Sequence, residues 1–139
     1  MKNTEIATAY IKDADIIFEE SEESFNKGHY HRTIRKCQES VELTLKGLLR
    51  LKGIEYPKSH RIGKIFIETF TDELDINFLQ KAADLSDQLA IDREPSFYGS
   101  EDVTAEELFD EEDAKDVLEK TKYIIDYVNE LLKQTQKSQ

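Results

Sequence analysis

Apolar side chains recur every three or four residues along most of the chain, which is the pattern of amphipathic α-helices. A first helix is predicted from Asn3 to Lys27 and a second from His29 to Lys52, with Gly28 and Gly53 as helix stops. No segment of strand length alternates regularly between apolar and polar residues. The pattern therefore predicts an all-α fold.

Further helical segments follow in the second half of the chain. A short helix is predicted to begin near Ser59 or His60. A fourth helix carries the apolar positions from Phe78 to Leu89 and is expected to be broken by the segment DREPSFYGS, since proline interrupts helical hydrogen bonding. After a short turn at TAEEL, a last helix is predicted from Glu111 to Lys133. We expect a single domain over residues 1–139, an up-and-down bundle of four main helices plus one short helix.

Composition adds expectations about the environment of the protein. No apolar run approaches the roughly 20 residues that span a bilayer, and acidic residues interrupt the N-terminal segment where a signal peptide would be apolar. The single cysteine, Cys37, cannot form an intrachain disulfide, and it falls within the apolar stripe of the second helix. We therefore expect a cytoplasmic protein without a membrane segment, in which Cys37 is a buried side chain rather than a nucleophile.

The charges are segregated along the chain. Its formal net charge is −11, yet the segment from Lys27 to Lys64 holds ten of the 19 Lys and Arg residues and only three of the 30 Asp and Glu residues. Such a basic segment suits phosphate in a nucleotide, in RNA or in a phosphorylated partner, while the acidic remainder disfavours a long duplex. The alternative is intramolecular: the basic helix neutralises acidic neighbours such as the helix that begins DEEDAKD.

The second helix carries both a cationic face and an unusual apolar ridge. Leu43 projects from the middle of the charged arc, and Gly47 and Leu51 continue the ridge at intervals of four residues. A leucine beside a glycine indicates that another element packs here, either the short helix or a second copy in a homodimer. The candidate phosphate-binding cations of this helix are Arg32, Arg35, Lys36, Lys46 and Arg50.

Several segments together resemble the HEPN domain (higher eukaryotes and prokaryotes nucleotide-binding). These are AxxYIKDAD, KCQESVELTLKGLLRLKG, HRIGKIF, REPSFYG and EEDAKDVLEKTKYIIDYVNELL, which span nearly the whole chain. The resemblance implies an up-and-down helical bundle that is commonly dimeric. It also implies a small, separately encoded nucleotidyltransferase as partner, often in a toxin–antitoxin pair. Many members of the family are metal-independent ribonucleases.

The ribonucleases of that family carry an arginine followed, after four to six residues, by a histidine. The imidazole transfers a proton at the ribose 2′-hydroxyl, and the guanidinium stabilises charge on the phosphate. This sequence offers Arg93, but the matching positions are Tyr98, Gly99 and Ser100, and no histidine follows His60. The departure argues against catalysis and leaves Arg93 and Tyr98 as candidates to bind a phosphate and a base. The alternative is that Arg93 pairs with an acidic neighbour while Tyr98 packs under a loop.

The remaining candidates complete the sequence-based hypothesis. His60 is expected to cap or pack at a helix start, and it is also a candidate ligand-binding residue. No metal site is expected, because the chain has no EF-hand spacing and no Glu-x-x-His pair, and no cofactor is expected. The leading hypothesis is a non-catalytic subunit that binds a nucleotide or a nucleotidyltransferase partner and presents the basic helix and the Arg93–Tyr98 loop. The alternatives are a divergent ribonuclease using Arg93 and His60, or a structural homodimer without a ligand.

Overall fold

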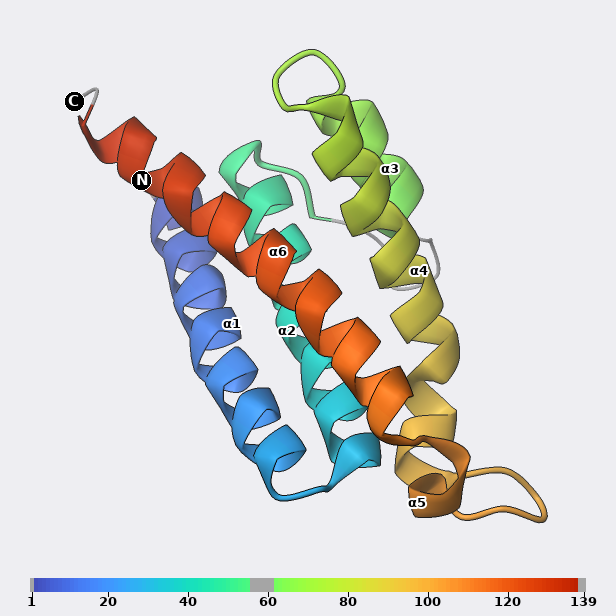
Figure 1. The fold of residues 1–139 in the computed structure, drawn as a ribbon. Helices are drawn as coiled ribbons and strands as arrows, with labels where there is room; N and C mark the ends of the chain where they lie inside the picture. The colour runs from blue at the N-terminus through green and yellow to red at the C-terminus, as the bar shows by residue number, and fades with distance from the viewer. Residues whose placement is uncertain (1, 56–61, 138–139) are drawn as a thin grey trace.

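The computed structural model describes residues 2–55 and 62–137, apart from the side chains of residues 136 and 137. Within these ranges all regular structure is helical, so the expected all-α fold is confirmed (Figure 1). Four helices are long and two are short, in the order α1 Lys2–Asn26, α2 Tyr30–Leu51, α3 Ile62–Phe70, α4 Ile76–Tyr98, α5 Ala105–Leu108 and α6 Glu111–Lys137.

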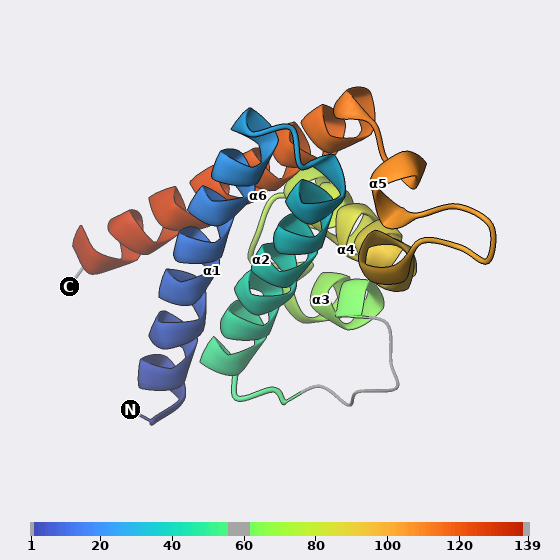
Figure 2. The ribbon, with the colours of Figure 1, turned by 90° about the horizontal axis from the view of Figure 1, so that it is seen from below.

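Consecutive long helices alternate in direction, which is the up-and-down arrangement (Figure 1). α1 and α2 form a hairpin that turns at Gly28, whose φ of +78° is one that glycine adopts without steric cost. α2 lies at the centre of the bundle and contacts α1, α4 and α6, while α3 packs on α4 (Figure 2). No helix among the described residues is long and apolar enough to cross a membrane.

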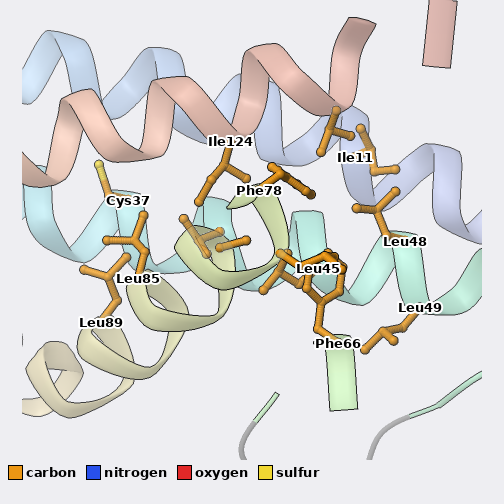
Figure 3. Packing of buried hydrophobic residues seen from close by; sticks show 14 of the residues in the cluster. Ile11, Cys37, Leu45, Leu48, Leu49, Phe66, Phe78, Leu85, Leu89 and Ile124 are labelled. Atoms are coloured by element: carbon orange, nitrogen blue, oxygen red, sulfur yellow. The ribbon is translucent and has the colours of Figure 1, made fainter. Parts of the chain in front are cut away.

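The core lies where the apolar stripes of the helices meet around α2 (Figure 3). Burial of each large apolar side chain stabilises the fold by about 1.5–3 kcal/mol. The rings of Phe66 and Phe78 meet edge to face, with centroids 6.1 Å apart. The cluster joins five helices through residues that include Ile11, Leu45, Leu48, Phe66, Phe78, Leu89 and Ile124.

The fourth helix differs from its predicted form. The segment DREPSFYGS does not break it, because α4 continues through Pro95 to Tyr98. A proline near the end of a helix removes only one hydrogen bond, and local bonds support the last turn. The Ser96 hydroxyl donates to the Arg93 carbonyl at 2.8 Å, and the Gly99 amide donates to the Pro95 carbonyl at 2.8 Å. Arg93 and Tyr98 therefore lie on a helix rather than in a loop.

The apolar ridge of α2 packs mainly inside the chain. A Cβ atom on Gly47 would come within 2.8 Å of the Ile11 side chain and 3.1 Å of the Ala7 carbonyl oxygen, both in α1. Leu43 packs against a small cluster between α1 and α6, whereas Leu51 remains 40% exposed. The neighbour of Gly47, expected to be the short helix or a second subunit, is thus α1 of the same chain.

Candidate functional site

Three of the five candidate cations on α2 are paired with carboxylates of the same chain. Pairs near the surface contribute little to stability, but they lower the positive potential that a ligand would meet. The cationic face predicted along the whole helix is therefore neutralised over much of its length, by Glu20, Glu42 and Glu55 rather than by the helix that begins DEEDAKD. The ion pairs are Lys36–Glu20 at 3.7 Å, Lys46–Glu42 at 3.4 Å and Arg50–Glu55 at 3.4 Å.

The other two cations lie at the N-terminal end of α2, beside the last turn of α4. The Arg35 Nη2 atom donates to the Ser96 carbonyl oxygen at 3.1 Å. The guanidinium carbon of Arg35 lies 3.9 Å from the centroid of the Phe97 ring. Arg32 is exposed and forms no ion pair within the described part of the chain. We call the group formed by His31, Arg32, Arg35, Arg93, Phe97 and Tyr98 the α2–α4 corner.

Positive charge at this corner is only partly compensated. Burial and the neighbouring Arg32 lower the pKa of Arg35, against the opposing effects of Glu39 and Tyr98. Burial, together with Arg35 and Arg32, also lowers the pKa of His31, against the opposing effect of Glu106 from α5. The His31 Nδ1 and Arg35 Nε atoms are enclosed and have no hydrogen-bond partner among the described residues. A negative group near these side chains would relieve the repulsion between them.

The motif residues of α4 are accessible at the same corner. Tyr98 is 78% exposed, so it does not pack under a loop. Its ring centroid lies 5.9 Å from that of Phe97. Arg93 is exposed one helical turn before Phe97 and forms no ion pair with a described residue. An exposed aromatic pair beside guanidinium groups can stack on a base while the cations contact phosphate.

The predicted ligand-binding residues do not form one site. Arg50 follows Arg35 by fifteen positions, which is about 22 Å along a helix, and it donates through Nε to the Asn3 side chain at 2.9 Å. Lys36 faces α1 through its ion pair. His60 lies outside the described residues.

Sequence reasoning overlooked His31 and Phe97 as members of the corner. Phe97 stood in a segment expected to be irregular, where helical spacing offers no guide to its neighbours. Phe97 is also an aromatic residue directly before Tyr98, and this pairing was the available signal for a stacking surface. His31 precedes Arg35 by four positions, which places both on one face of α2.

Other reactive chemistry is limited in the part of the chain that the structure describes. No group of three or more His, Cys, Asp or Glu side chains there could hold a metal ion. Cys37 is fully buried, which confirms the expectation from its place in the apolar stripe. Burial raises the pKa of its thiol to about 11, so a thiolate nucleophile is disfavoured at neutral pH.

The up-and-down bundle makes this a small all-helical domain. The family model of the HEPN domain matches residues 7–131, and the chain belongs to this family. It is 25% identical over 140 residues to a protein of Methanocaldococcus jannaschii named "Putative toxin MJ1304", covering 95% of this chain and 91% of that protein. It also resembles the crystal structure of ST0689, an archaeal HEPN homologue, with a TM-score of 0.65 and 26% identity. That match covers 90% of this chain and 96% of the other.

Proposed function

We propose that this HEPN-family chain is a non-catalytic binding subunit that recognises a nucleotide at the α2–α4 corner. In this proposal it works with a separately encoded nucleotidyltransferase in a toxin–antitoxin-like pair. The observation that carries the proposal is the contact of Arg35 with both Ser96 and Phe97, because it joins the basic helix to the motif of α4. The similarity to a protein named as a toxin supports the toxin-like role.

The ligand follows from the chemistry of the corner. Arg32 and Arg93 are exposed guanidinium groups that suit a phosphate, and Tyr98 offers a ring on which a base can stack. The first turns of α5 and α6 bring Glu106, Glu107 and the acidic residues 111–113 to the same end of the molecule. These carboxylates would repel a long polyanion, so the ligand is a mononucleotide or a short oligonucleotide.

Thermal unfolding with added ATP, other nucleoside triphosphates and mononucleotides tests this proposal. A nucleotide that binds the folded state raises the melting temperature. Arg32→Ala removes a charge-assisted contact and is expected to weaken binding by about tenfold or more. Lys46→Ala is the matched control, because it removes a cation of the same helix that is paired with Glu42 and lies about 21 Å further along. A melting temperature unchanged by every nucleotide contradicts the proposal.

The nucleotidyltransferase partnership has a separate test. The reading frame beside the gene for this chain is expected to encode a small protein with a Gly-Ser motif and paired aspartates. Co-expression of the two proteins, with an affinity tag on only one, is expected to yield a complex. Absence of such a neighbour, or elution of the two proteins apart, contradicts this part of the proposal.

We also propose that the chain forms a homodimer, and that the exposed end of α4 contributes to the interface. Ile91 is 71% exposed, and Tyr98 lies seven residues later on the same face of the helix. A two-fold axis beside Ile91 would bring this residue of the two copies together and leave the Tyr98 rings at the edges of the contact, open to a ligand. Leu51 is also exposed, at the far end of α2, but its neighbour on the same face, Gly47, is covered by α1. Leu51 therefore does not belong to an extended exposed apolar surface.

Sedimentation analysis of the wild-type protein and two variants tests the homodimer. Ile91→Glu is expected to give monomers, because it places charges in the apolar interface. Ile16→Glu is the control, since Ile16 is 50% exposed on α1 and lies outside the proposed interface. A monomeric wild-type protein, or a dimer that Ile91→Glu leaves intact, contradicts this interface.

A divergent ribonuclease is the second candidate function, and the position of His31 favours it. His31 brings an imidazole to the corner that holds Arg32 and Arg35, although the α4 motif itself has no histidine. Incubation of the purified protein with total RNA in EDTA tests this function. Cleavage that His31→Gln abolishes and His29→Gln preserves supports it, whereas intact RNA excludes it.

A further inference from the structure

The last turn of α4 lacks part of the backbone support of a helix. Pro95 has no amide hydrogen, so the Ile91 carbonyl receives no helical hydrogen bond from that position. The Ser100 amide, which a continued helix would direct to the Ser96 carbonyl, donates instead to the Val103 carbonyl at 2.8 Å. The Ser96 carbonyl is therefore one of the helix-terminal acceptors that need a partner from outside the helix.

Arg35 of α2 supplies that partner. Its Nη2 atom donates to the Ser96 carbonyl oxygen at 3.1 Å. Its guanidinium group also lies over the Phe97 ring, with the central carbon 3.9 Å from the ring centroid. A cation at a helix C-terminus interacts favourably with the helix dipole, and a guanidinium stacks well on an aromatic face. Two successive residues of the weak turn are thus held by one side chain.

A glycine constrains the other side of this turn. Gly99 has a φ of +72°, and a Cβ atom there would clash with the Val103 carbonyl oxygen. The chain therefore reverses direction at Gly99 in a conformation that other residues cannot adopt without strain. Tyr98 stands between this reversal and the contacts made by Arg35.

We propose that Arg35 is a positioning residue that keeps the last turn of α4 helical and thereby sets the position of Tyr98. This role differs from the ligand-binding role that the sequence predicts for Arg35, because its guanidinium is engaged within the chain. Without the Arg35 guanidinium group, the Ser96 carbonyl and the Phe97 ring lose their contacts with α2. The last turn of α4, which carries Tyr98, then unfolds locally more often.

The contact also couples this turn to ligand binding, a consequence that rests on the proposed function. Arg32 and Arg35 are neighbouring cations on α2. A phosphate beside Arg32 would relieve their repulsion and favour the position of Arg35 against α4. By thermodynamic reciprocity, protein whose last α4 turn is helical would then bind the nucleotide more tightly than protein whose last α4 turn is locally unfolded.

Hydrogen exchange of the Gly99 and Ser100 amides tests the proposal, because both amides are hydrogen-bonded at this turn. The test variants are Arg35→Met, which removes both the charge and the guanidinium group, and Arg35→Lys, which keeps the charge but removes the guanidinium group. Each is expected to accelerate exchange at these amides by about tenfold or more, with the rest of the bundle unchanged. Lys46→Met is the matched control on the same helix and is expected to exchange as the wild type does.

The outcomes separate this proposal from nucleotide binding. Wild-type exchange at Gly99 and Ser100 in folded Arg35→Lys and Arg35→Met proteins overturns the positioning role. If Arg35→Met does not fold, Arg35→Lys alone decides the result. ATP is expected to slow exchange in the wild type and in Lys46→Met but not in Arg35→Met. Accelerated exchange in the Arg35 variants without any effect of ATP supports the positioning role and contradicts the proposed nucleotide binding.

Discussion

At the scale of single residues, the surroundings decide what a charged side chain can do. Arg35 and Lys46 occupy the same helix, yet Lys46 pairs with Glu42 one turn away, whereas Arg35 contacts a carbonyl and a ring of α4. The lysine pair is local and only partly buried, and such pairs on a helix contribute about 0.3–0.5 kcal/mol. The Arg35 contacts join residues 61 positions apart, so their effect depends on the packing of two helices.

Cys37 gives a prediction at this scale. Its side chain is buried and its pKa is raised to about 11, so the thiolate population at pH 8 is small and a reagent cannot reach it. Native protein is therefore expected to react with a disulfide reagent such as DTNB much more slowly than urea-unfolded protein does. Equal rates in the two states, followed by absorbance, would show that the thiol is accessible.

At the scale of elements, the helix predicted to break at DREPSFYGS shows how local hydrogen bonds and one tertiary contact together override the signal of a proline. Pro95 predicts an interruption, and it does remove one helical hydrogen bond. The helix nevertheless continues for three more residues, because the Ser96 hydroxyl, the Gly99 amide and the Arg35 guanidinium satisfy groups in the last turn. As a result, Tyr98 is the last residue of α4.

The close packing of α1 on α2 gives a prediction about Gly47. Alanine is normally favoured over glycine within a helix by about 1 kcal/mol. A Cβ atom at this position would come within 2.8 Å of the Ile11 side chain and 3.1 Å of the Ala7 carbonyl oxygen. Gly47→Ala is therefore expected to lower the free energy of unfolding by about 1–3 kcal/mol, measured by urea denaturation. A stabilised variant would show that α1 and α2 are not so closely packed.

The contact between α1 and α6 predicts a dependence on pH. Burial, together with Glu19 and Asp126, raises the pKa of Asp15, although the Asn129 side chain donates a hydrogen bond to its carboxylate. A carboxyl group whose pKa is raised on folding destabilises the folded state above that pKa, and the effect disappears as the pH falls through it. Asp15→Asn is thus expected to raise the melting temperature near pH 7 and to have no stabilising effect at about pH 3.

Asp13→Asn is the control for this experiment. Asp13 is exposed on the same helix, so the variant removes the same charge without relieving a half-buried carboxylate. Its melting temperature is expected to rise less than that of Asp15→Asn near pH 7 and to follow the wild type at about pH 3. An equal gain in both variants would assign the effect to net charge rather than to the environment of Asp15.

At the scale of the whole molecule, charge that is segregated along the sequence is largely mixed in space. The helix α2 of the basic segment lies at the centre of the bundle, where Lys36 pairs with Glu20 of α1, and Lys46 and Arg50 pair with Glu42 and Glu55. The α2–α4 corner is where exposed guanidinium groups gather beside exposed aromatic rings. Binding is therefore expected at one end of the bundle rather than along the length of α2.

The net charge of −11 gives a prediction for the whole molecule. Repulsion among the carboxylates destabilises the compact state, and added salt screens it. Most of the ion-paired side chains are substantially exposed, so little stability is lost when salt weakens those pairs. The melting temperature is therefore expected to rise as sodium chloride is increased from low to physiological concentration. A falling melting temperature would show that the ion pairs outweigh the repulsion.

The sequence by itself determined the helical class, the approximate bounds of the helices, the burial of Cys37 and the membership of the HEPN family. These properties depend on spacing and residue identity over short stretches, which the linear pattern contains. Only the tertiary structure decided that α4 continues past Pro95, that α1 covers Gly47 and that Lys36 pairs with Glu20. The physical reason is similar in each case. A partner from another helix takes part: Arg35 of α2 for the end of α4, Ile11 of α1 for Gly47, and Glu20 of α1 for Lys36. No local pattern specifies which distant groups will meet.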